Sequence, residues 1–161
     1  MTKKLSHFDQ TGRAQMVDVG NKTPTQRLAV AKGQVRISPE LAQILIEGKL
    51  EKGDAFTVAK TAAILAAKKT GELIPMCHPL GLDQVSVELT LDQKQSLVLI
   101  QATAKLTGKT GVEMEALMAV SMAALTFYDM CKAVDKKMII EGICLVRKEG
   151  GKSGTFINDP L

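Results

Sequence analysis

The chain of 161 residues is 45% hydrophobic, which fits one compact domain, 1–161, with a buried core. Its net charge of +4 comes from lysines and arginines scattered along the sequence, and few aromatic side chains are present to stack on bases, so composition does not indicate a nucleic-acid surface. Three cysteines without a CxxC pair argue against a disulfide framework, and neither an apolar leader nor a run of membrane-spanning length is visible. We expect a cytoplasmic protein that binds a small anionic ligand, with no nucleic-acid or membrane partner.

The first third of the chain predicts extended structure and then a helix. Residues 16–19 and 27–37 are rich in the residues that favour strands. Ser38 followed by Pro39 is a helix opening, because a capping residue precedes a proline at the first helical position. The apolar stripe that follows predicts a helix ending near Gly48.

A second helix is expected from Asp54 to about Lys69. Alanines recur on one of its faces at helical spacing, so another element is expected to pack closely against it. The members of this face are Ala59, Ala62, Ala63 and Ala66.

The second half begins with a change of period. Apolar and polar residues alternate over 85–91, a turn follows at 92–95, and a second strand over 97–105 completes a hairpin. A long helix over 112–134 and a final strand over 138–147 end the series. The order strand, helix, helix, strand, strand, helix, strand is the split βαβ pattern with one added helix, an α/β (α+β) fold.

The two ends of the chain and the outer side of the long helix give two further predictions. Residues 1–13 and 157–161 are expected to be flexible. From Ala116 to Phe127 the long helix is apolar on nearly every face, although a helix on one sheet face should be polar on its outer side. A second copy of the chain, meeting the first through a two-fold interface, is the expected cover.

One glycine-rich loop could bind an anion. Residues 106–111, Leu-Thr-Gly-Lys-Thr-Gly, stand between a strand and a helix, where free N–H groups favour negative charge. They are not a P-loop, because Thr103 occupies the position of the required glycine, and Val146 does the same for the loop at 150–154. Thr110 and Glu113 also fit a capping box, a structural role.

Residues 75–82, Pro-Met-Cys-His-Pro-Leu-Gly-Leu, place His78 beside Cys77 in a turn between two prolines. Proline removes backbone donors and restricts the residue before it, so this turn is expected to be rigid and to present the imidazole in one place. A satisfied structural histidine fits the motif equally well. We predict no metal site, because adjacent side chains rarely converge on one ion and zinc sites usually show two spaced ligand pairs.

Asp129 and Lys132 are three residues apart on the long helix and therefore share a face. One interpretation is a surface ion pair of small energy. The other is an acid/base pair at the edge of an apolar surface, where proton affinities shift. Lys52 by itself reads as a solvated loop lysine.

Taken together and in order, six segments resemble the cyclic pyranopterin monophosphate synthases of molybdenum cofactor biosynthesis, the MoaC family. The resemblance covers nearly the whole chain. Its segments are 16–19 (Met-Val-Asp-Val), 52–54 (Lys-Gly-Asp), 74–80 (Ile-Pro-Met-Cys-His-Pro-Leu), 106–117 (Leu-Thr-Gly-Lys-Thr-Gly-Val-Glu-Met-Glu-Ala-Leu), 128–134 (Tyr-Asp-Met-Cys-Lys-Ala-Val) and 150–154 (Gly-Gly-Lys-Ser-Gly).

The resemblance implies a ferredoxin-like subunit in a cytoplasmic homohexamer, a trimer of dimers. It implies a lyase whose substrate is a cyclised dihydro-GTP made by an upstream radical SAM GTP cyclase. The enzyme would rearrange this substrate into cyclic pyranopterin monophosphate and release pyrophosphate. These steps need proton transfers but no redox step, so we expect no tightly bound cofactor and only Mg²⁺ that arrives with the triphosphate. A non-catalytic oligomeric nucleotide-binding module and an oligomeric structural protein remain as alternatives.

The resemblance also implies roles for individual residues. Lys52, Asp129 and Lys132 match the acid/base group, with Asp129 as the assigned active-site residue. The residues that match substrate-binding or other pocket positions are Arg27, Met76, Cys77, His78, Glu113, Met114, Glu115 and Lys152.

Overall fold

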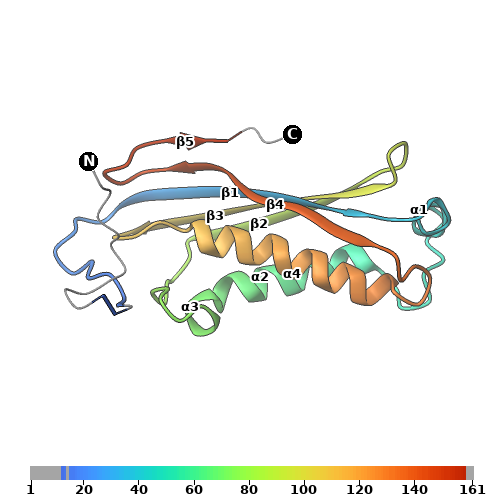
Figure 1. Ribbon diagram of the computed structural model, residues 1–161, viewed down its shortest axis with the longest axis horizontal. Coiled ribbons are helices and arrows are strands. Elements are labelled where there is room, and N and C mark those ends of the chain that lie inside the picture. The colour runs from blue at the N-terminus through green and yellow to red at the C-terminus, as the bar shows by residue number, and fades with distance from the viewer. Residues whose placement is uncertain (1–11, 14, 159–161) are drawn as a thin grey trace.

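A computed structural model describes residues 12, 13 and 15–158 and shows a sheet with helices against one of its faces (Figure 1). Residues 1–11, 14 and 159–161, which include most of the flanks expected to be flexible, lie outside the described residues. The elements in chain order are β1 (Thr25–Arg36), α1 (Pro39–Ile46), α2 (Ala55–Lys68), α3 (Thr70–Leu73), β2 (Gln84–Asp92), β3 (Leu97–Gly108), α4 (Glu113–Cys131), β4 (Ile139–Glu149) and β5 (Phe156–Ile157).

The described strands form one antiparallel sheet in the order β2-β3-β1-β4-β5. β1 is central and pairs over its whole length with β3, from Thr25 opposite Gly108 to Arg36 opposite Leu97. The long helices α2 and α4 lie on the same face of the sheet, and α1 lies near one end of it (Figure 1). This order and these directions confirm the predicted ferredoxin-like, split βαβ fold, with α1 as the added helix.

Local signals set the starts of the first two helices as predicted. The Ser38 hydroxyl accepts a hydrogen bond from the Leu41 amide, with Pro39 at the first helical position. Asp54 accepts hydrogen bonds from the amides of Phe56 and Thr57, both at 3.0 Å, and so caps α2. The Asp54 cap also fixes the loop that carries Lys52, two residues earlier.

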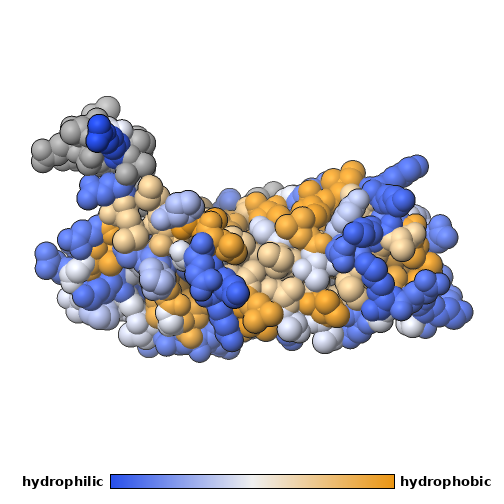
Figure 2. All heavy atoms as spheres, turned by 90° about the horizontal axis from the view of Figure 1, so that it is seen from below, coloured by the Kyte–Doolittle hydropathy of each residue, from blue (hydrophilic) through white to orange (hydrophobic). Residues whose placement is uncertain are grey.

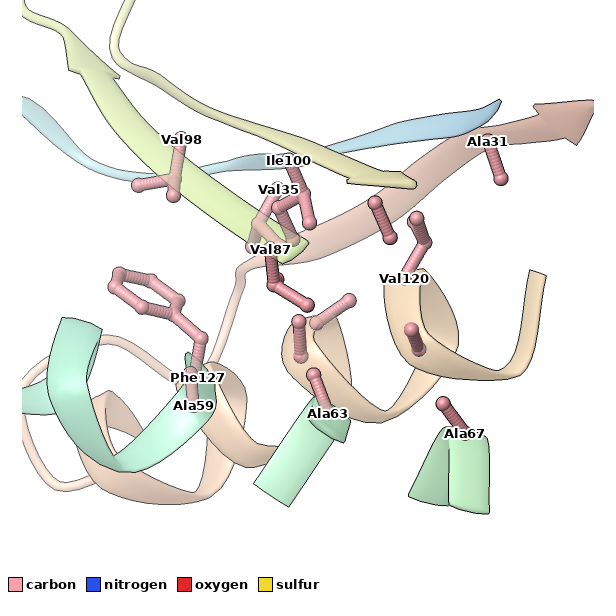
Figure 3. Close-up of a cluster of buried hydrophobic side chains, with 14 of the residues drawn as sticks. Ala31, Val35, Ala59, Ala63, Ala67, Val87, Val98, Ile100, Val120 and Phe127 are labelled. Atoms are coloured by element: carbon pink, nitrogen blue, oxygen red, sulfur yellow. The ribbon is translucent and has the colours of Figure 1, made fainter. Parts of the chain in front are cut away.

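Alanines allow α2 and α4 to lie close together beneath the sheet. Ala119 and Ala123 of α4 are fully buried, as are Ala59 and Ala63 of α2, which Figure 3 labels. Ala62, expected on the same α2 face, is half-buried. Above them, β1 and β3 contribute the alternate residues that point toward the helices, and Phe127 fills the space beside Phe56, with ring centroids 5.6 Å apart. The predicted small-residue face is confirmed.

Gly33 allows the sheet to approach α4 from above. A Cβ added at this position would lie 2.8 Å from Cγ1 of Val120 and 2.9 Å from Cγ1 of Ile143. The central strand therefore lies close to α4 at the position that glycine occupies. α4 is held between β1 on one side and α2 on the other.

α4 is long and apolar enough, by composition alone, to cross a membrane. Half of that helix is buried inside this domain, where it packs on the sheet and on α2. Its apolar character on those two sides is therefore explained by the core.

The structure corrects three predictions and adds one helix. Residues 16–19 are not strand: the Asp18 carboxylate accepts from the Gly20 amide and the chain turns, so this segment finds no strand partner. Ile157, expected in the flexible tail, lies in β5 and pairs with Arg147 of β4. The long helix ends at Cys131 rather than 134, and the short helix α3 after α2 was not predicted. The first two errors concern segments whose hydrogen-bond partners are distant or depend on the sheet, and after Cys131 the amides of Val134 and Asp135 bond to the Cys131 carbonyl in a turn.

We predict that Ala63→Leu lowers the free energy of unfolding by about 1–3 kcal/mol, because three added carbon atoms have no space between α2 and α4. Ala62→Leu is the matched control, since Ala62 is on the same helix but only half-buried. Denaturant unfolding of both variants measures the difference. Equal stability of the two variants would show that the helix interface is not tightly packed.

Candidate active site

A pocket of about 980 Å³ lies where the N-terminal segment, the proline-flanked turn, the start of α4 and the loop after β4 meet. All eight residues expected to bind substrate line it, although they come from four separate parts of the chain. Those residues are Arg27, Met76, Cys77, His78, Glu113, Met114, Glu115 and Lys152.

The turn that carries His78 is held from both sides. The Cys77 amide donates to the Ile74 carbonyl at 3.0 Å, which closes the turn after α3. At Gly71, an added Cβ would lie 2.8 Å from the His78 carbonyl oxygen, so α3 packs directly on the turn backbone. On the pocket side, Nε2 of His78 lies 2.9 Å from the Val17 carbonyl oxygen.

The start of α4 faces the pocket. The predicted capping box is wrong: α4 begins with Val112 as its N-cap, and within the described part of the chain no side chain caps this helix end. Glu113 is therefore the first helical residue, and a Cβ at Gly111 would collide with its carboxylate. Because no described side chain caps this helix end, it suits an anionic ligand at the same place.

Glu115 is a buried carboxyl group, 3% exposed, at the base of this region. Burial raises its pKa above the ordinary value of 4.5, opposed by a hydrogen bond from its own amide and assisted by the nearby charge of Glu113. Burial also raises the pKa of the Cys77 thiol, with a smaller contribution from Glu115. The pocket wall formed by these two residues therefore favours neutral, protonated groups.

The pocket lining is also rich in cations. It contains Lys22, Lys109 and Lys148, which sequence reasoning did not select, beside the expected Arg27 and Lys152. Arg27 donates to the Gly108 carbonyl at 3.3 Å and Lys109 donates to the Gly20 carbonyl at 2.6 Å, so these cations are anchored to backbone. Five cations in the lining of one pocket suit a ligand with several negative charges.

A second cluster lies at the other end of α4. The Asp129 carboxylate is 2.6 Å from Nζ of Lys132 and 3.4 Å from Nζ of Lys52, and Lys52 also donates to the Asp129 backbone carbonyl at 2.8 Å. Lys52, which by itself reads as a solvated loop lysine, thus contacts Asp129 at the end of α4, 77 residues later in the chain. The structure brings together the three expected acid/base residues.

The proton affinities in this second cluster shift toward the charged forms. Hydrogen bonds from Lys132 and Lys52 lower the pKa of Asp129, and Asp129 raises the pKa of Lys132. All three side chains are about half exposed, at 43–58%. In one copy of the chain this is a solvated ion cluster rather than a site tuned for proton transfer near neutral pH.

The pocket and the second cluster do not meet within one chain. Glu115 and Asp129 are fourteen positions apart on α4, which at 1.5 Å per residue is about 21 Å. Among the described residues, no group of three or more His, Cys, Asp or Glu side chains is placed to hold a metal ion. The candidate residues thus form two sets, eight at the start of α4 and three at its end.

We predict that Glu115→Gln becomes stabilising, relative to the native protein, as pH rises. A carboxyl group with a raised pKa contributes stability below its unfolded pKa and loses it as pH rises through its folded pKa, whereas glutamine does not titrate. Melting temperatures measured from pH ~4 to pH ~8 should therefore diverge in favour of the variant. Glu88→Gln, at an exposed position on β2, controls for loss of a surface charge. A difference in melting temperature between Glu115→Gln and the native protein that does not change with pH would contradict the burial of this carboxylate.

Comparison with known proteins agrees with this geometry. The family model described as the MoaC family matches residues 16–151. The cyclic pyranopterin monophosphate synthase of Roseiflexus sp. (strain RS-1) is 57% identical over 155 residues, which cover 96% of this chain and 98% of that protein. The synthases of Chloroflexus aggregans and Clostridium perfringens are 56% and 53% identical over 95% and 97% of this chain, and the alignments cover 93% and 99% of those proteins. The chain therefore belongs to the MoaC family.

Proposed function

We propose that this protein is a cyclic pyranopterin monophosphate synthase of molybdenum cofactor biosynthesis, a lyase that converts a cyclised dihydro-GTP into cyclic pyranopterin monophosphate and pyrophosphate. The observation that carries the proposal is the pocket at the start of α4, which gathers all eight expected substrate-binding residues. Full-length relatives with more than half of their residues identical support the same activity.

The pocket chemistry suits this substrate. Five cations in the pocket lining match a triphosphate and the pyrophosphate that leaves, since Arg and Lys stabilise phosphate oxygens by charge-assisted hydrogen bonds. The same lining offers groups that donate or accept protons, namely Cys77, His78, Glu113 and Glu115. Ring opening, ring closure and cyclic phosphate formation need such transfers but no electron transfer. We therefore propose no resident cofactor, with Mg²⁺ arriving on the substrate's triphosphate.

The acid/base residues are proposed to act on this pocket from a second copy of the chain. One copy leaves about 21 Å between Glu115 and Asp129. Antiparallel packing of two α4 helices brings the start of one helix beside the end of the other, so that each site takes its pocket from one copy and its Lys52–Asp129–Lys132 cluster from the partner copy.

The outer side of α4 supports this pairing. Positions three or four apart form one stripe: Met114 at the pocket, then Met118, Ser121 and Leu125, with Asp129 at the far end. Met114 and Leu125 are 39% and 56% exposed. Figure 2 shows apolar side chains among charged ones on this helix-covered face. Burial of the stripe by a second α4 would also remove water from the exposed ion cluster and move its proton affinities, as acid/base chemistry requires.

The remaining parts of the proposal are a cytoplasmic homohexamer, a trimer of such dimers, supplied by a radical SAM GTP cyclase. The resemblance to the family supports the assembly and the supplier. All three cysteines are free thiols, which supports a reducing compartment.

A non-catalytic nucleotide-binding module is the second candidate, and the pocket alone would serve it. The ion cluster at the far end of α4 favours the enzyme, because binding would not need Lys52 and Asp129 to converge from positions 77 residues apart. Incubation with the cyclised dihydro-GTP separates the two. The enzyme releases pyrophosphate and forms the pyranopterin, whereas a binding module returns the substrate unchanged.

We expect Lys52→Ala, Asp129→Ala and Lys132→Ala to remain folded oligomers with turnover reduced on the order of 10²–10⁴-fold, the usual contribution of a positioned acid or base. Lys60→Ala, at an exposed lysine of α2, is the control and should keep near-native turnover. Rates are measured with the cyclised substrate. Near-native rates in any two of the three variants would remove the cluster from the mechanism.

Mixing variants tests the shared site. Each of Glu115→Ala and Asp129→Ala should be inactive alone, but co-assembly of the two creates sites in which a native pocket meets a native cluster, so activity returns. Mixing Lys52→Ala with Asp129→Ala is the matched control, because both changes damage the same cluster and every site stays defective. Verified mixed dimers of the first pair without activity would show that each site lies within one copy.

A further inference from the structure

One ring nitrogen of His78 donates a hydrogen bond to the backbone. Its Nε2 lies 2.9 Å from the carbonyl oxygen of Val17, and the side chain is half-buried. A carbonyl oxygen only accepts hydrogen bonds, so Nε2 must carry the hydrogen. In neutral imidazole the other ring nitrogen, Nδ1, then has the free lone pair.

We propose that the Val17 carbonyl is the positioning group for His78: it fixes the Nε2–H tautomer and leaves Nδ1 as the nitrogen that accepts a proton or hydrogen bond from the bound substrate. This inference rests on the proposed function and adds to it which atom of the imidazole reacts and what holds the ring. Val17 does not itself act on the substrate.

Residues 15–24, here called the N-terminal strap, are shaped to deliver this carbonyl. Val17 and Val19 are half-buried and line the pocket, whereas Asp18 between them is exposed and lies outside the pocket lining. The Asp18 carboxylate accepts from the Gly20 amide at 2.7 Å, and the Lys22 amide donates to the Val19 carbonyl at 3.1 Å. These two bonds turn the strap back over the pocket immediately after Val17.

The ring is therefore constrained from opposite sides. α3 packs against the backbone of His78 at Gly71, and the strap bonds to the far edge of the imidazole. Lys109 holds the strap a second time, through the Gly20 carbonyl at 2.6 Å. A second partner on a histidine ring commonly fixes its tautomer and orientation. In metal sites, loss of such a partner lowers metal affinity or activity 10–100-fold.

The test uses the full chain labelled with ¹⁵N-histidine. His7 is the other histidine, so a His7→Gln background leaves one imidazole. At pH ~8 the two ring nitrogens should show separate shifts, protonated at Nε2 and unprotonated at Nδ1, rather than the averaged shifts of a ring that exchanges between tautomers. Averaged shifts, or a hydrogen on Nδ1, would overturn the proposal without any activity measurement.

Asp18 supplies the matched variants. Asp18→Ala removes the acceptor for the Gly20 amide and should release the strap, so that the shifts move toward the average and kcat/KM falls about 10-fold. Asp18→Asn keeps the acceptor oxygen and should therefore show the native ¹⁵N shifts and the native kcat/KM. Native shifts or native turnover in a folded Asp18→Ala protein would overturn the positioning role, and the native spectrum alone decides the tautomer if that variant does not fold. Absence of turnover in the native protein would instead reject the proposed function and leave the tautomer result standing.

Discussion

Close packing of α4 between the sheet and α2 is the constraint on which both clusters depend. Alanines on the two helices remove the side-chain bulk that would separate them, and Gly33 does the same for β1. A helix held along its length keeps a fixed rise, so the distance between the Cα atoms of Glu115 and Asp129 is fixed. The same packing that stabilises the core therefore keeps the two sets of candidate residues apart in one copy of the chain.

The two sets also differ in their electrostatic environment. Glu115 is buried, and loss of water raises its pKa, whereas Asp129 is exposed between two lysines that lower its pKa. Each environment follows from position on one helix. The first turn of α4 lines the pocket together with the turn at His78 and the strap, while Asp129 in its last turn is exposed to solvent. Only a further covering element would bring the second set into a low-dielectric site.

Recognition of the site from sequence depended on motifs rather than on charges. Cys77 and His78 stood out because prolines flank them, and Glu113 and Glu115 because they open an apolar helix. Lys22, Lys109 and Lys148 were missed, since a single lysine in a basic chain reads as solvated. Lys109 had a signal, its place in the loop between β3 and α4. The other two lysines reach the pocket through the strap and the end of β4, and their convergence is a property of the fold.

By itself, the sequence determined the elements whose signals are local. Alternating apolar residues specified β2, and the turn after it placed β3 as the second strand of a hairpin. Ser38 and Asp54 specified the starts of α1 and α2, and the element order specified the split βαβ topology. Tertiary structure decided what depends on distant partners. Residues 16–19 carry a strand-like pattern but find no neighbouring strand, and they bond instead to His78, 61 residues later. The burial of Glu115 and the pairing of Lys52 with Asp129 are likewise decided by the fold, because burial and charge pairing depend on which distant surfaces meet and not on the residues adjacent in the chain.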